Sequence, residues 1–185
     1  MRNEQGMALV VVTMTLLLLL AVGGALALTT SSEVWIATNY RTSQQARYAA
    51  EAAAEWALLD LPTVADDWPA LLATHVQSWF VDGVAAGRRA LPDGSSIDLG
   101  SIVARNAAWQ LYAYGPLRGL LASPAGESAG SDFYVILFVA EDPASPDRLK
   151  VRSHAFGPRG SHKLIEICVL RGVSGVRVVS WTEVR

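Results

Sequence analysis

The chain has 185 residues, 51% of them hydrophobic, and a formal net charge of −2 at pH 7. A chain with this small negative net charge has no global electrostatic attraction to nucleic acid, so nucleic acid is not indicated as a partner. Cys168 is the one cysteine, which excludes an intramolecular disulfide. Fold and function must therefore be inferred from how apolar residues are distributed along the chain.

An uncharged apolar run occupies residues 7–28. As a helix it would span roughly 33 Å, enough to cross the hydrocarbon core of a bilayer. We therefore predict a single transmembrane anchor there, preceded by a short polar leader over residues 1–6. An ordinary cleaved secretory signal is the alternative, because Ala25-Leu26-Ala27 resembles a cleavage site.

The helix is predicted to continue as a stalk over residues 29–61. No glycine or proline occurs between Gly24 and Pro62, so nothing in that stretch breaks a helix. A competing signal lies at residues 30–33, where Thr30 and Glu33 fit a capping box that would begin a second helix.

Small side chains recur on one face of the predicted stalk. Ala46, Ala49, Ala50, Ala53 and Ala57, together with Trp56, follow helical spacing. Alanine permits close approach of another element, so this face could pack on the chain's own remainder, face a neighbouring helix, or do both.

Two local patterns carry a resemblance to a known family. Gln5-Gly6 followed by Met-Ala-Leu-Val-Val-Val resembles the leader junction of type IV prepilins. Residues 2–59 as a whole resemble the PilX N-terminal domain of minor pilins. The matching residues of the motif are Glu33, Asn39, Arg41, Ala49, Ala50, Glu51 and Ala52.

The resemblance implies processing, partners and a location. A prepilin peptidase would cleave after Gly6 and methylate the new N-terminal residue, Met7. Other minor and major pilins would bind through the N-terminal helix. The chain would cross the bacterial inner membrane once, with its head in the periplasm, before any incorporation into an extracellular pilus.

One residue departs from the pattern of major pilins. By the same resemblance, they carry a glutamate at the fifth position of the mature chain, where this sequence has Val11. Because a carboxylate within a membrane is costly, a pilin that has one needs a partner for it, such as a neighbour's N-terminal amine. The valine argues against a major filament subunit.

Residues 62–185 are predicted to form a globular head. Pro62 should end the stalk, residues 62–67 should turn, and residues 69–82 should form a short helix. A hairpin is expected over residues 88–98, around Pro92-Asp93-Gly94, and a loop over residues 115–131. Strands are expected at residues 109–114, 133–140, 149–155, 163–170 and 176–184.

Connections between the last strands suit an antiparallel meander. The predicted fold class is α+β, with a long N-terminal transmembrane and stalk helix packed on a small C-terminal antiparallel sheet, as in pilins. The head has four tryptophans, Trp68, Trp79, Trp109 and Trp181. Most are expected in the core, and one or two could face a partner subunit.

The residues that could take part in catalysis or metal binding are each expected to have an ordinary structural role. His75 is expected on a helix, His154 on the polar side of a strand and His162 in a turn, without metal-ligand spacing. Cys168 is expected to be a core thiol. Asp66-Asp67 and Glu141-Asp142 are expected to be solvated turn residues, and Gly157 to Gly160 a turn between strands.

No enzyme and no cofactor is therefore predicted. The sequence predicts a structural minor pilin or pseudopilin-like subunit that helps to assemble, prime or cap a type IV pilus or related secretion filament. A single-pass membrane sensor or adaptor with a periplasmic domain is the alternative.

Overall fold

The computed structural model describes residues 2–64, 67–120, 131–172 and 175–184. The chain divides into two compact units, Met1–Arg41 and Thr42–Arg185. The first unit is helical. The second contains the remaining turns of that helix and all strands of the chain's described part.

Helix α1 runs from Arg2 to Val64 without interruption. The Thr30 hydroxyl donates to the carbonyl of Leu26 at 3.0 Å, so it does not cap a new helix, and the capping-box alternative is wrong. The predicted end at Pro62 is also wrong, because α1 includes this proline. A proline so close to a helix end removes only one helical hydrogen bond, and the helix continues for two residues.

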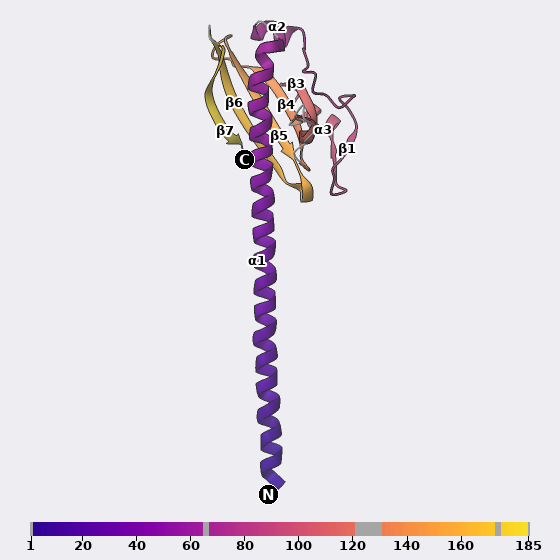
Figure 1. The fold of residues 1–185 in the computed structure, drawn as a ribbon, viewed down its shortest axis with the longest axis vertical. Helices are drawn as coiled ribbons and strands as arrows, with labels where there is room; N and C mark the ends of the chain where they lie inside the picture. The colour runs from indigo at the N-terminus through magenta and orange to yellow at the C-terminus, as the bar shows by residue number, and fades with distance from the viewer. Residues whose placement is uncertain (1, 65–66, 121–130, 173–174, 185) are drawn as a thin grey trace, which may run out of the picture. The chain divides into compact units, whose positions relative to one another are not determined.

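A five-stranded antiparallel sheet dominates the second unit. Its strands follow in chain order and confirm the predicted meander. They are β3 (Gln110–Pro116), β4 (Tyr134–Glu141), β5 (Arg148–Phe156), β6 (His162–Gly172) and β7 (Gly175–Val184). Figure 1 shows the C-terminal turns of α1 crossing one face of this sheet, with β7 along one edge. The α+β class predicted from the sequence is thereby confirmed.

The sheet separates two apolar cores. On the α1 side, the fully buried alanines of the helix pack with Val135, Leu137 and Val139 of β4 and with inward residues of β5 and β6. On the other side, Ile136 and Phe138 of β4 pack with the smaller elements. The continuous apolar run of β4 is explained by burial on both faces.

Helix α2 is shorter than predicted, spanning only Trp68–Ala73. The Asp67 carboxylate accepts a hydrogen bond from the Ala70 amide at 2.6 Å and caps its start, while His75, with φ of 50°, lies beyond its end. The rest of the predicted helix instead runs beside β3. Three backbone hydrogen bonds hold it there: Ser78 to Tyr112, Tyr114 to Phe80, and Asp82 to Tyr114.

The remaining elements divide between the two faces of the sheet. The hairpin and the helix that follows it pack on the second face, whereas Leu117 and Leu120 belong to the core on the α1 side. Strands β1 (Arg88–Ala90) and β2 (Ser96–Asp98) form the predicted hairpin. Helices α3 (Leu99–Arg105) and α4 (Leu117–Leu120) were not predicted, and a single 3-10 turn, η1, covers Pro158–Gly160. Residues 121–130 of the predicted 115–131 loop lie outside the described part of the chain.

Candidate assembly surface

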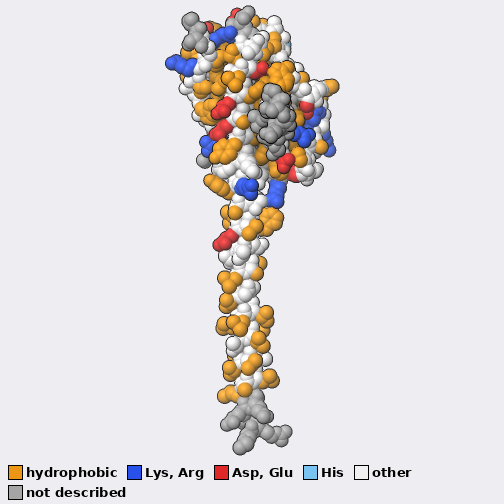
Figure 2. All heavy atoms as spheres, in the orientation of Figure 1, with side chains coloured by type: hydrophobic (Ala, Val, Ile, Leu, Met, Phe, Trp, Pro, Cys, Tyr) orange, Lys and Arg blue, Asp and Glu red, His pale blue; other side chains and the backbone are white. Residues whose placement is uncertain are grey.

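The first unit presents an unusually apolar surface. Every side chain from Met7 to Leu28 is exposed, and α1 is long and apolar enough, counted from Met7, to cross a membrane. Hydrophobic side chains dominate its visible face in Figure 2. Thr13 and Thr15 donate their hydroxyls to helical carbonyls at 3.0 and 2.8 Å. These hydroxyls therefore need no water, which suits an apolar environment.

The two residues at the predicted processing site lie within α1. The helix already includes Gly6, and Met7 is 73% exposed.

The PilX-like motif divides between the two units. In the first unit, Glu33, Asn39 and Arg41 all have exposed side chains. In the second unit, Ala49 and Ala50 are buried in the core on the α1 side of the sheet.

The buried alanine face lets α1 approach the sheet closely. Ser153 of β5 donates its hydroxyl to the backbone carbonyl of Ala50 at 2.8 Å. Tyr112 of β3 donates its hydroxyl to the Asp60 carboxylate at 2.6 Å, and both residues are buried. Burial, followed by the hydrogen bond to Asp60, raises the pKa of Tyr112 far above its ordinary value. The small-residue face is thus occupied by the chain's own sheet.

Glu51, the acidic residue of the motif, belongs to a chain of ion pairs. Arg47 Nε lies 2.9 Å from Glu51 Oε1 and 3.8 Å from Glu183 Oε2 of β7. Lys163 of β6 contacts Glu183 at 2.5 Å. The hydrogen bond to Glu51 raises the pKa of Arg47 above its ordinary value. The spacing of Arg47 and Glu51 was visible in the sequence, whereas the contact with Glu183 depends on the fold.

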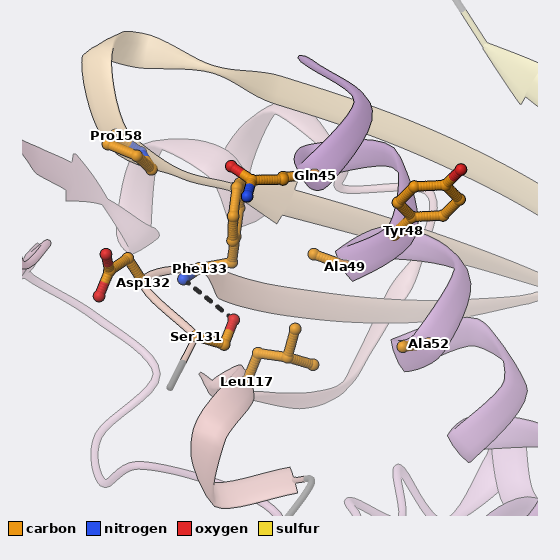
Figure 3. A pocket seen from close by; sticks show the side chains of 9 residues that line it. All are labelled: Gln45, Tyr48, Ala49, Ala52, Leu117, Ser131, Asp132, Phe133 and Pro158. Atoms are coloured by element: carbon orange, nitrogen blue, oxygen red, sulfur yellow. Dashed lines mark hydrogen bonds between the residues drawn. The ribbon is translucent and has the colours of Figure 1, made fainter. Parts of the chain in front are cut away.

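An exposed groove of about 380 Å³ lies beside the C-terminal turns of α1. Figure 3 shows it between Ala49 and Ala52 of the helix and Leu117 and Phe133 of the sheet region. Gln45, Tyr48, Ser131, Asp132 and Pro158 complete its lining. Among these described residues there is no histidine, no cysteine and no second carboxylate, so the groove lacks an acid–base pair.

The tryptophans of the head are less buried than predicted. Trp68 is 1% exposed, but Trp79 is 71% and Trp181 39% exposed. Trp109 is half-buried with the Arg152 guanidinium 3.9 Å above its ring. Trp79 stands against Trp56 of α1 with ring centroids 6.1 Å apart. The prediction that most of them lie in the core is wrong, because the burial of Trp79 and Trp181 depends on which distant elements the fold places beside them.

The histidines also depart from prediction. His154 is 7% exposed rather than on a solvated polar face, and His162 begins β6 rather than lying in a turn. Nδ1 of His154 lies 3.1 Å from Nε2 of His162. Nε2 of His154 has no hydrogen-bond partner among the residues that the structure describes. Burial, then the charges of His162, Arg152 and Arg105, lowers the pKa of His154 to about 3.

One acidic residue predicted to be solvated is buried. Asp142 is only 7% exposed and contacts Lys150 at 3.9 Å. It accepts a hydrogen bond from the Cys168 thiol at 3.4 Å. Cys168 itself is buried, and burial raises the pKa of its thiol. Within residues 2–64, 67–120, 131–172 and 175–184, no three His, Cys, Asp or Glu side chains are grouped to hold a metal ion.

Comparison with known protein families gives a match at the N-terminal end of the chain. Residues 5–55 match the family model described as PilX N-terminal, which confirms the resemblance found in the sequence. No curated protein matches the chain, and no solved structure does. The match covers the exposed helix of the first unit and the alanine block of the second.

Proposed function

We propose that this chain, whose residues 5–55 match the PilX N-terminal family, is a structural minor pilin or pseudopilin-like subunit. It would help to assemble, prime or cap a type IV pilus or a related secretion filament. The observation that carries the proposal is the family match over a helix whose apolar side chains, from Met7 to Leu28, are all exposed.

The distribution of the motif supports a division of roles along α1. The alanine block contributes to the fold of the head, because its buried members pack on the sheet. Glu33, Asn39 and Arg41 remain exposed, as do Trp35 and Tyr40. Contacts with neighbouring pilins are therefore proposed to use residues 7–41 rather than the alanine face.

Processing and topology follow from the same proposal. The proposed domains are the leader 1–6, the transmembrane anchor 7–28, a helical stalk that begins at residue 29 and ends with α1 at Val64, and the head that follows it. A prepilin peptidase removes the leader and methylates Met7. The anchor crosses the inner membrane once, leaving the head in the periplasm until assembly. The role is structural and needs neither a catalytic residue nor a cofactor.

Intact mass of the mature chain tests this proposal. The full chain, produced in cells that process other pilins, should begin at Met7 and carry one methyl group. Gly6→Val should retain the leader and still insert in the membrane, while Gly23→Val, within the anchor, should be processed normally. A Cβ added at Gly23 would meet no atom within 4 Å.

A chain that keeps Met1 in those cells would contradict the pilin proposal. That result would favour a single-pass sensor or adaptor, which has no need for prepilin processing.

A further inference from the structure

The two edges of the sheet differ in their backbone pairing. Along β3, residues 78–82 form three backbone hydrogen bonds, so that edge is covered. β7 ends the strand order on the other side, and within the described ranges no strand lies beyond it. A strand edge offers alternating N–H and C=O groups, whose natural partner is the backbone of another extended segment.

The composition of β7 gives this edge little protection. Natural edge strands are commonly short or carry proline or lysine, which discourages pairing. β7 spans ten residues, Gly175–Val184, without either residue type. One register shift against β6 occurs between Cys168 and Val169, but Ser180–Val184 remain regularly paired. Half of the edge is therefore an uninterrupted strand.

The face of β7 toward α1 is apolar and incompletely covered. Val178 and Trp181 lie opposite Val169 and Ile167 of β6, both of which belong to the core beneath α1. Val178 remains 38% and Trp181 39% exposed. An added strand would extend this core sideways if it placed apolar side chains beside these two residues.

Charge distinguishes between possible occupants. Arg177 is exposed, and it forms no ion pair with any described residue. The acidic residue of β7 is Glu183, which already contacts Lys163 at 2.5 Å and Arg47 at 3.8 Å. A second copy of β7 would bring the same engaged carboxylate. The charge of Arg177 is better matched by a strand from a different protein that carries an acid.

We propose that the free edge of β7 accepts an extended strand from a different pilin subunit. That strand places apolar side chains beside Val178 and Trp181 and a carboxylate opposite Arg177. This inference rests on the proposed function, because a filament supplies the neighbouring pilins.

The extent to which edge variants are incorporated into filaments tests this proposal. Filaments are sheared from cells expressing the full chain, and its copy number is measured by quantitative mass spectrometry against the membrane pool. Val178→Lys and Arg177→Glu should each lower incorporation roughly tenfold, because a misplaced or like charge opposes pairing. Arg88→Glu is the matched control, since Arg88 is an exposed arginine on β1.

Folding is checked separately on each full-length variant in detergent, by its thermal unfolding midpoint. Incorporation of folded Val178→Lys and Arg177→Glu at the wild-type level would overturn the proposal. A general loss that includes Arg88→Glu would also overturn it, because the effect would not be specific to the edge.

Ser180→Cys, in a Cys168→Ser background, tests whether a second copy of this chain occupies the edge. Oxidation of membranes or filaments should give no homodimer, and a disulfide-linked homodimer would overturn the choice of a different subunit. Wild-type chain that keeps Met1 and is absent from filaments would overturn the proposed function together with this inference. Processed wild type present in filaments, with edge variants equally present, would overturn the inference alone.

Discussion

The Ser153 hydroxyl on β5 donates a 2.8 Å hydrogen bond to the backbone carbonyl of Ala50 on α1, and both residues are fully buried. The hydroxyl can reach the backbone of the helix because only small alanine side chains lie between the helix and the sheet at this point, so the two approach closely. Around the contact, Ala46, Ala53, Ala54 and Ala57 are also fully buried. Close packing here leaves no room for larger side chains.

Ala53→Leu is expected to destabilise the head by about 1–3 kcal/mol, because three added carbons must enter a packed helix–sheet contact. Ala52→Leu is the matched control, since Ala52 is partly exposed beside the groove. The free energy of unfolding is measured by urea titration of the full chain in detergent, with near-ultraviolet circular dichroism. Equal stability of the two variants would contradict close packing at Ala53.

A second packing prediction concerns Gly157, which lies between β5 and η1 in extended backbone. A Cβ here would overlap the ring of Phe133 and lie 2.7 Å from Ser161 Oγ. Gly157→Ala should therefore lower stability by about 1–3 kcal/mol, since the buried ring must move. Gly172→Ala is the control, because its Cβ would meet Gly175 O at an ordinary 3.7 Å. The thermal unfolding midpoints of the variants and the wild type are compared. An equal midpoint for Gly157→Ala and the wild type would show that the ring of Phe133 moves aside at no cost.

Local sequence patterns were sufficient for most of the sheet. The unbroken apolar run predicts strand β4, the alternation predicts strand β5, and the Pro92-Asp93-Gly94 turn predicts the hairpin of β1 and β2. These signals are local, since burial of a strand on one or both faces is recorded in its own residues.

Features that depend on distant partners were missed. Apolar residues at positions 71–80 fit a helix, but residues after Ala73 pair with β3, which lies more than thirty residues further along the chain. Burial of Asp142 and His154 likewise depends on side chains from other strands. The role of the alanine face stayed open for the same reason.

Acidification should lower the free energy of unfolding of the head, because the buried ring of His154 resists protonation. Its pKa is about 3 in the folded chain and 6.5 ordinarily, so the unfolded chain binds more protons between those values. Stability from the neutral ring is complete above pH 6.5 and is lost as the pH falls toward 3. Between pH 7.5 and 5.0 the loss should be on the order of 2 kcal/mol.

Urea titrations of the full chain at the two pH values measure this loss. His154→Gln should lose less stability than the wild type on acidification, because glutamine does not titrate. His75→Asn is the control: His75 is exposed, and asparagine tolerates its positive φ. An identical pH dependence in wild type and His154→Gln would contradict the role of His154.

The last prediction concerns Val11, which is exposed on the apolar helix of the first unit. By family resemblance, the fifth mature residue of a major pilin is a glutamate that pairs with a neighbour's N-terminal amine. Valine lacks that carboxylate, and an amine left unpaired among apolar helices costs several kcal/mol. The loss would occur once for a rare subunit but would be repeated along a filament built from this chain. We therefore expect a low copy number relative to the major subunit.

Quantitative mass spectrometry of sheared, purified filaments measures that ratio. Val11→Glu should raise incorporation, because it supplies the missing carboxylate at the matching position. Val12→Glu is the matched control: Val12 is similarly exposed, yet a carboxylate one residue further along points about 100° around the helix and should lower incorporation. Finding the wild-type chain as the most abundant subunit would refute the low-copy prediction. A Val11→Glu chain no more abundant than Val12→Glu would refute the explanation from the missing carboxylate.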